Sequence, residues 1–281
     1  MSVQGAGMEA GQRVLEVTSP IARAGISIFF ITTYTNDYVL FPKNAKSHVI
    51  RALEDRNFTF EKNSRSYTNP NSHHRHLSSD SEPTSPSTPP PATLKDLQNR
   101  TFSQLLKHQI KPKLDRDICL VQCASRTENP DTVVADDLAL QQGLTKSLIY
   151  QPKFLSVTMT ENQSASLLLE ERLVSNFDIA DGLDNVLLGA KDDILIPIIL
   201  DLASLGMDAS GIVCGVAVKL VGGPGPGVVD LTYLSTANTG IVIVNENDLD
   251  NAMHTLKVDV DGESQYGDTR LSPIDIPKPP G

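Results

Sequence analysis

The segment 205–213 contains the residue types in this 281-residue chain that are best suited to bind a small anion. It follows an apolar run that predicts a strand and precedes one that predicts a helix. Asp208 or Ser210 could cap this helix, and the amides around Ser210, Gly211 and Ile212 present a partial positive charge that attracts a carboxylate. An ordinary helix cap with close helix packing would explain the same residues.

Catalytic motifs are missing from the sequence. There is no Gly-x-Ser-x-Gly elbow and no His-Glu-x-x-His motif, and the loop 222–227 lacks the Lys and Ser/Thr of a phosphate loop. His73, His74 and His76 could gather around a transition metal, but their polar surroundings favour a plain linker. We expect no enzymatic activity, no cofactor and no metal.

Composition narrows the choice of partners and compartment. With 24 Lys+Arg against 34 Asp+Glu, the net charge of -10 disfavours binding to nucleic acid. Three cysteines give no disulfide framework, and Cys119 and Cys123 lie too far apart on one predicted strand to bridge each other. No run resembles a signal peptide or membrane span. We therefore expect a cytoplasmic protein with no membrane partner.

The apolar residues fall into three clusters separated by polar sequence. The stretch 64–93 is dominated by Ser, Thr and Pro, and its Ser85-Pro86 and Thr88-Pro89 steps could accept phosphate. From this pattern we predict a partial domain (1–61), a disordered linker (62–116), a degenerate domain (117–192), a complete domain (193–260) and a disordered tail (261–281).

The first and last domains have the same predicted order of elements. The first reads helix, strand, strand, helix (13–24, 26–34, 38–41 and 46–56), and the last reads strand, helix, strand, strand, helix (194–200, 211–220, 228–234, 241–244 and 248–256). A shift of 203 positions aligns them: Thr33 falls on Thr236, Asn36 near Asn238, Val39 on Val242 and Leu53 on Leu256.

This internal repeat predicts an α+β fold of tandem ferredoxin-like βαββαβ units, with an antiparallel sheet and two helices on one face. Strands predicted at 118–123, 153–160 and 164–170 would form a third, degenerate unit.

The segments 19–34, 206–213 and 234–238 resemble the CASTOR family of ACT-domain proteins. The resemblance covers 11–61 and, more loosely, 117–258. It implies tandem ACT domains that bind a small amino acid between paired units, without chemistry, and that signal nutrient status to the TOR pathway through a GATOR-type complex. A homodimer is a further implied arrangement.

The resemblance also implies which residues bind the ligand. Ser27 and Ile28 would line it from the first hairpin, and Thr236 with Ala237 would close the side-chain end. The amino and carboxylate groups would be held by the turn that contains Gly206, Asp208, Ser210, Gly211 and Ile212.

Two positions depart from the family in the same direction. Ala209 and Gly240 stand where the family has acidic residues, and Asp37 is the counterpart of Gly240 in the first repeat. A guanidinium group needs a carboxylate for paired hydrogen bonds, so arginine is a doubtful ligand. The identity of the amino acid stays open.

The amino terminus also differs from the pattern of the CASTOR family. The family has a complete unit before this region, whereas 1–11 is short and Gly-rich, so we expect the first strand of this unit to be missing. Either a partner chain or a second protomer supplies it, or the chain is a truncated product or an incomplete gene prediction. We favour truncation, because an exposed sheet centre invites aggregation. The alternative functions are a scaffold that has lost ligand binding and a regulatory domain of amino-acid metabolism.

Overall fold

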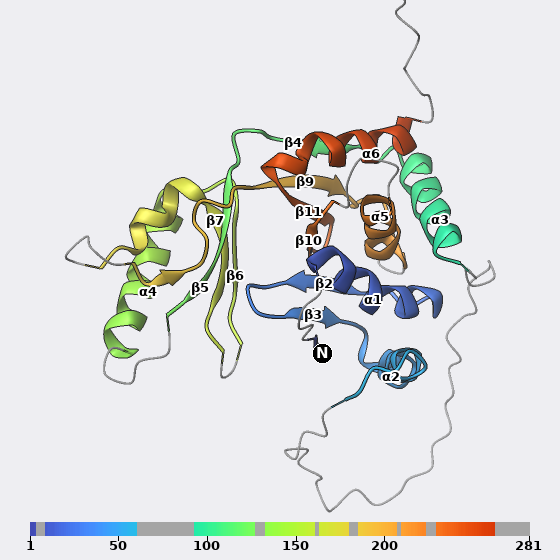
Figure 1. Cartoon of the computed structure of the whole chain (residues 1–281), viewed down its shortest axis with the longest axis horizontal. Helices are drawn as coiled ribbons and strands as arrows, with labels where there is room; N and C mark the ends of the chain where they lie inside the picture. Colours follow the sequence, from blue (N-terminus) through green and yellow to red (C-terminus); the bar gives the residue numbers. More distant parts are fainter. Residues whose placement is uncertain are drawn as a thin grey trace, which may run out of the picture.

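The computed structural model describes residues 1–3, 9–60, 93–126, 133–160, 163–179, 185–206, 209–222 and 229–261, without the side chains of 133–134 and 257–261. One sheet runs through the molecule in the order β1-β3-β2-β10-β11-β9-β5-β7-β6, and all its pairings are antiparallel. Figure 1 shows helices lying against this sheet in two groups, with α4 well apart from α1, α3, α5 and α6. The predicted α+β class with an antiparallel sheet is confirmed.

The first unit contains β1 (Ser2–Val3), α1 (Ala10–Arg23), β2 (Phe29–Thr32), β3 (Asp37–Leu40) and α2 (Lys46–Glu54). Helix α1 buries Val14, Val17 and Ile21 on one face and ends before Gly25, whose φ of 69° is easily reached only without a side chain. Strand β1 pairs with β3. The first strand that we expected to be missing is therefore present, shortened to two residues.

The last unit contains β9 (Leu195–Asp201), α5 (Ile212–Val221), β10 (Leu231–Ser235), β11 (Thr239–Asn245) and α6 (Leu249–Asp261). Its hairpin turn copies that of the first unit. The amide of Thr33 donates to the carbonyl of Asn36, and that of Thr236 donates to Thr239, both at 2.8 Å. The aligned apolar residues are buried in both units (Val39, Val242, Leu53 and Leu256). The repeat predicted from the 203-residue shift is thus present in three dimensions.

Part of the predicted linker belongs to the last unit. Helix α3 (Leu94–Lys107) begins with a capping box between Thr93 and Asp96 and packs on α5 and α6. Strand β4 (Pro112–Leu114) then pairs with β9. The expectation of disorder over 93–116 was wrong, because Leu97, Phe102 and Leu105 supply a buried apolar face. Residues 61–92, which include the three linker histidines and both phosphorylation candidates, lie outside the described residues, as does the tail after 261.

The middle unit contains β5 (Leu120–Ser125), α4 (Val133–Ile149), β6 (Leu155–Thr158), β7 (Ser166–Glu170), the 3-10 helix η2 (Glu171–Phe177) and β8 (Leu187–Leu188). Its buried apolar residues form a core of their own. Gly143 of α4 lies against the ring of Phe177, where a Cβ atom would come within 2.3 Å of the ring. The unit is degenerate because a short 3-10 helix stands in the place of its second helix.

The first and last units pair side by side. Strand β2 meets β10 at Ile31 and Leu234, and α1 lies beside α5, so that the two units share one apolar core. The middle unit joins β9 through one backbone pair, Leu120 with Leu195. No helix in the described part of the chain is long and apolar enough to cross a membrane.

Candidate functional site

A cavity of about 430 Å³ opens between the first and last units, a volume in the range of small-molecule sites. The first unit contributes the residues just before and at the start of β2 and those at the end of β3. The last unit contributes the turn before α5 and the β10–β11 turn. The lining residues are Ser27, Ile28, Phe29, Leu40, Phe41, Pro42, Leu202, Leu205, Gly206, Ala209, Ile212, Val213, Tyr233, Ser235, Thr236, Ala237 and Thr239.

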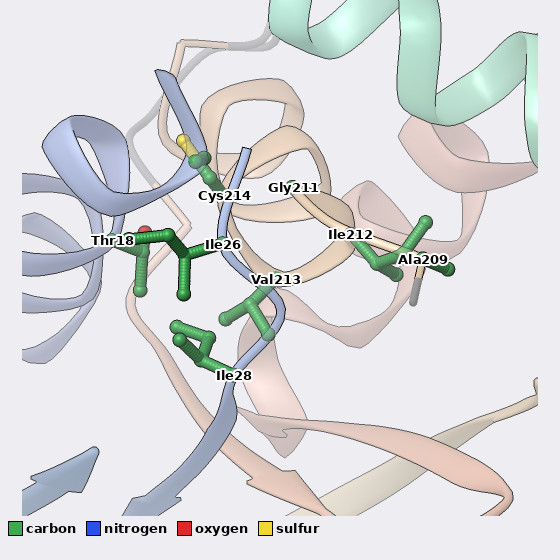
Figure 2. Close-up of a pocket in the computed structure, with 9 residues that line it drawn as sticks. Thr18, Ile26, Ile28, Ala209, Gly211, Ile212, Val213 and Cys214 are labelled. Atoms are coloured by element: carbon green, nitrogen blue, oxygen red, sulfur yellow. The ribbon is translucent and has the colours of Figure 1, made fainter. Parts of the chain in front are cut away.

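A second, much smaller space of about 30 Å³ adjoins it, large enough for roughly one water molecule. Figure 2 shows Ile26, Ile28 and Val213 converging where α1 passes the beginning of α5. Ile28, Ala209, Ile212 and Val213 line both spaces, so the small one forms the inner end of the site.

The beginning of α5 has no side-chain cap and lies at the cavity. The N-cap is Gly211, with φ 83°, and it has no side chain to cap the helix. Ser210 is thus not seen in the capping role that the sequence suggested. Asp208, the other candidate cap, lies outside the described residues. The first amides of α5 carry the positive end of the helix dipole, and Ile212, the first residue of this helix, lines the cavity.

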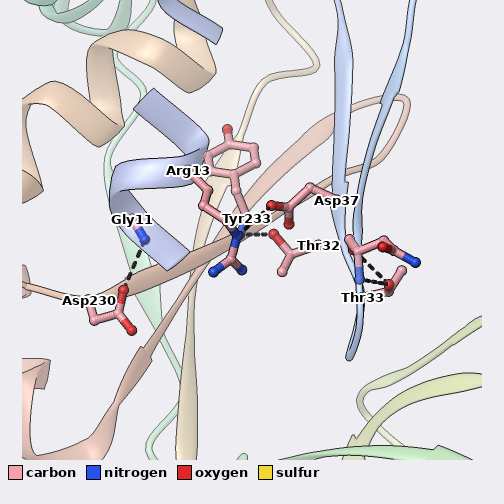
Figure 3. Close-up of polar contacts among 8 residues, drawn as sticks. Gly11, Arg13, Thr32, Thr33, Asp37, Asp230 and Tyr233 are labelled. Atoms are coloured by element: carbon pink, nitrogen blue, oxygen red, sulfur yellow. Dashed lines mark hydrogen bonds and ion pairs between the residues drawn. The ribbon is translucent and has the colours of Figure 1, made fainter. Parts of the chain in front are cut away.

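The repeat shows what such a helix end accepts in this fold. The 203-residue shift places Asp230 on Ser27. Asp230 stands before β10, and its Oδ1 accepts a hydrogen bond of 2.9 Å from the amide of Gly11 in the first turn of α1 (Figure 3). The chain thus fills one helix end with its own carboxylate. At the equivalent end, beside α5, it places the short, uncharged Ser27.

Polar groups in the cavity come from hydroxyls and backbone. Ser235 Oγ accepts a hydrogen bond of 3.0 Å from the amide of Phe30, which ties the two units together beside the site. The amide of Thr239 donates to Thr236 Oγ1 at 3.1 Å within the β10–β11 turn. None of the described lining residues carries a charge, so the described walls suit an uncharged ligand side chain.

Asp37 and Gly240 occupy equivalent positions of the repeat, and neither places a carboxylate in the cavity. Asp37 is fully buried and pairs with Arg13 Nε at 3.1 Å rather than facing the cavity (Figure 3). Burial raises the pKa of Asp37, and the Arg13 guanidinium opposes that rise. A Cβ atom on Gly240 would lie 2.0 Å from the Tyr233 hydroxyl, so that ring occupies the space of an acidic side chain. The hydroxyl is buried, and no described residue forms a hydrogen bond with it.

Most of the predicted ligand residues meet at these two spaces. The larger cavity is lined by Ser27, Ile28, Gly206, Ile212, Thr236 and Ala237. Gly211 lines the smaller space, and Ser210 lines neither. The apolar walls at Phe29, Leu40, Phe41, Leu202 and Leu205 and the buried Tyr233 were not predicted, because no local pattern in the sequence marks which strand end faces a neighbouring unit.

Titratable groups suited to catalysis do not gather elsewhere in the described chain. No three His, Cys, Asp or Glu side chains come together there as a metal site. The three cysteines are free thiols. Burial raises the pKa of Cys123, and raises that of Cys214 to about 11, which leaves both thiols protonated and poorly nucleophilic.

Residues 1–55 match the family model described as an ACT domain, and they coincide with the first unit. No curated protein matches the chain. A solved protein of unknown function from Vibrio cholerae, described as a possible transport protein, is 16% identical with a TM-score of 0.35, over 56% of this chain and 94% of its own. The aspartate kinase from Synechocystis is 13% identical with a TM-score of 0.34, over 92% of this chain and 39% of the kinase. Similarity this low carries no argument about function.

An ACT domain is therefore present at the start of the chain, and the fold agrees with ferredoxin-like ACT domains in tandem. ACT domains commonly bind small amino acids. In general terms, the match indicates a regulatory, amino-acid-binding role.

Proposed function

We propose that this chain is a non-enzymatic regulatory protein that binds a small amino acid in the cavity between its first and last units. The observation that carries the proposal is the contrast between the two equivalent helix ends. One is filled by the Asp230 carboxylate, and the other opens beside Ser27 at a cavity of about 430 Å³. A ligand carboxylate at α5 would take the place that Asp230 takes at α1.

The rest of the cavity favours a neutral ligand. The Ser27 hydroxyl lines the cavity and can contact the polar head of an amino acid, while Phe41, Leu202 and Leu205 form apolar walls. The Thr236 hydroxyl also lines the cavity, but it is hydrogen-bonded to Thr239 within the β10–β11 turn. A cationic side chain would be desolvated there without a paired carboxylate on any described lining residue, which costs several kcal/mol. We therefore favour an uncharged amino acid over arginine.

Binding without chemistry fits the side chains that are present. The described walls of the larger cavity offer hydroxyls but no histidine, cysteine or carboxylate that could activate them. Cys214 lines the smaller space, where burial raises the pKa of its thiol to about 11. The Tyr233 hydroxyl is also a poor acid or base, because burial raises its pKa far above the usual range.

The signalling role is a finer part of the proposal. The resemblance to CASTOR proteins supports a cytoplasmic nutrient sensor that acts on the TOR pathway through a GATOR-type complex. The amino acid would change how strongly the chain binds that complex. Association of the tagged chain with that complex, measured with and without the amino acid, tests this part. A scaffold without a ligand would bind the complex equally in both conditions.

A thermal-shift panel of the twenty amino acids tests ligand binding by the full chain. A ligand at 100 times its Kd adds about 2.7 kcal/mol to the free energy of unfolding, which raises Tm by several degrees. We expect one or a few neutral amino acids to raise Tm. A flat panel on demonstrably folded protein would reject the proposal and favour the scaffold.

A further inference from the structure

The Tyr233 hydroxyl is a buried polar group in the wall of the larger cavity. Tyr233 is 1% exposed, and no described residue forms a hydrogen bond with its Oη atom. The neighbouring hydroxyls of the β10–β11 hairpin are bonded: Ser235 Oγ accepts from the amide of Phe30 at 3.0 Å, and Thr236 Oγ1 accepts from that of Thr239 at 3.1 Å. A buried polar group without a partner is unfavourable and rare in folded proteins, so the hydroxyl requires an explanation.

The strand register directs this hydroxyl toward the β10–β11 turn. Tyr233 pairs with Val242, whereas Gly240 pairs with Ser235, two residues closer to the turn. A Cβ atom on Gly240 would lie 2.0 Å from Tyr233 Oη and 3.3 Å from Leu202 Cδ1. The ring therefore extends over the sheet from its own strand position to the space that Gly240 leaves free. There the hydroxyl lies beside Leu202, which also lines the cavity.

Neither packing nor a buried charge accounts for the hydroxyl. A phenylalanine would fill the same volume without an unpaired polar atom. Figure 3 shows the hydroxyl pointing away from the Arg13–Asp37 pair, so it does not belong to that ion pair. Burial raises the pKa of Tyr233, so the group is a neutral O–H that can donate one hydrogen bond and accept others.

A bound ligand can supply the partner that the described chain does not. Under the proposed function, the ligand carboxylate lies at the beginning of α5 and its side chain lies among the remaining walls. Leu202 and Leu205 suit the methylene groups of that side chain, and the Tyr233 hydroxyl suits a polar atom at its end. A charged end is disfavoured, because no described lining residue carries an opposite charge.

We propose that Tyr233 hydrogen-bonds the side chain of the bound amino acid and thereby selects a neutral polar side chain, a hydroxyl or a carboxamide, over an apolar one of the same size. This inference rests on the proposed function. An apolar side chain leaves the buried hydroxyl unpaired, whereas a hydroxyl or carboxamide oxygen accepts its hydrogen bond, and this difference discriminates between the two ligands.

Three pairs of amino acids with similar shapes test this selection. They are threonine and valine, asparagine and leucine, and glutamine and methionine. Calorimetric titration of the full chain should show that the polar member of at least one pair binds at least tenfold more tightly than its apolar counterpart. Tyr233→Phe should weaken binding of that polar amino acid at least tenfold, or about 1.4 kcal/mol, and should leave the Kd of the apolar counterpart unchanged or lower.

Tyr150→Phe provides the matched control. Tyr150 follows α4 in the middle unit, is 62% exposed, and loses the same hydroxyl group. Its Kd values should equal those of the parent, and circular dichroism checks that both variants fold.

The outcomes separate this inference from the proposed function. A parent without a preference for the polar member of any pair would overturn the role of Tyr233 and leave amino-acid binding intact. So would a Tyr233→Phe chain that keeps the parent's preference, whether or not it is less stable. A parent that binds none of the six also overturns this role, and the thermal-shift panel of all twenty then shows whether amino-acid binding itself fails.

Discussion

Ile31 of β2 and Leu234 of β10 occupy the same position of the internal repeat and are paired with each other where the two units meet. This relationship gives the pair of units approximate two-fold symmetry. Because of this symmetry, the beginning of α1 and the beginning of α5 are equivalent. Asp230, just before β10, lies at the beginning of α1, and Ser27, just before β2, lies at the cavity beside α5. The cavity of about 430 Å³ opens beside the α5 end, whereas the Asp230 carboxylate occupies the α1 end.

Removal of the Asp230 carboxylate should weaken α1. Asp230→Ala deletes the acceptor of the Gly11 amide at the positive end of the helix, so we expect a loss of about 1 kcal/mol in the free energy of unfolding. Urea denaturation measures it. Asp193→Ala, in an exposed turn, is the control and should lie within about 0.5 kcal/mol of the parent. Equal stability of the two variants would contradict the capping role.

The buried Arg13–Asp37 pair should give a pH-dependent stability. Burial raises the pKa of Asp37, so its contribution to stability is present below its unfolded pKa and is lost as pH rises through the folded value. Arg13→Met removes the opposing charge and raises that pKa further. We expect a loss of about 3 kcal/mol near neutral pH, where the carboxylate is left unpaired.

Acidification should reduce this loss, because a protonated Asp37 needs no cationic partner. Denaturation of parent and Arg13→Met near pH 7 and near pH 4.5 measures the difference, with Arg13→Met/Asp37→Asn as the control that lacks the titrating group. A penalty that is the same at both pH values would show that Asp37 does not titrate as the buried partner of Arg13.

Close packing of α3 on α5 should be sensitive to a single methyl group. A Cβ atom on Gly215 would lie 2.0 Å from Thr101 Oγ1, so Gly215→Ala should cost about 1–3 kcal/mol. Thr101→Ala in the same chain should recover part of that loss, since it removes the colliding atoms. Independent, additive effects in this double-mutant cycle would show that α3 is not docked as described.

The Tyr233 hydroxyl should destabilise the free protein. It is buried and has no hydrogen-bond partner among the described residues, and such a group costs about 1–3 kcal/mol relative to an apolar isostere. Tyr233→Phe should therefore equal or exceed the parent in Tm. A fall of several degrees would mean that the hydroxyl is bonded in the free protein, for example to a buried water.

Local patterns in the sequence were enough to predict the repeat and most of its elements. Val14, Val17 and Ile21 mark one helical face, and the turn between Thr33 and Asn36 separates two β-rich runs, so both elements follow from neighbours in the chain. The predicted strand 26–34 was too long, because 26–28 line the cavities instead of forming a ladder.

Long-range features could not be predicted in this way. Helix α3 looked like linker because its helical pattern was weak, and its place is fixed by the close approach of Thr101 to Gly215, 114 positions away along the chain. The pairing of Asp37 with Arg13 likewise depends on how α1 crosses the sheet. The domain boundaries and the ligand assignments of Ser27, Gly206 and Thr236 stay predictions, although these residues share one cavity.

The most direct test of the account is the thermal response of Ser27→Asp to the amino acids that shift the parent. The new carboxylate should occupy the end of α5 as Asp230 occupies that of α1, so we predict a folded variant, at least as stable as the parent, whose Tm no amino acid raises. Ser47→Asp, on the exposed side of α2, should respond like the parent. A Ser27→Asp chain that still responds to the parent's amino acid would contradict the account.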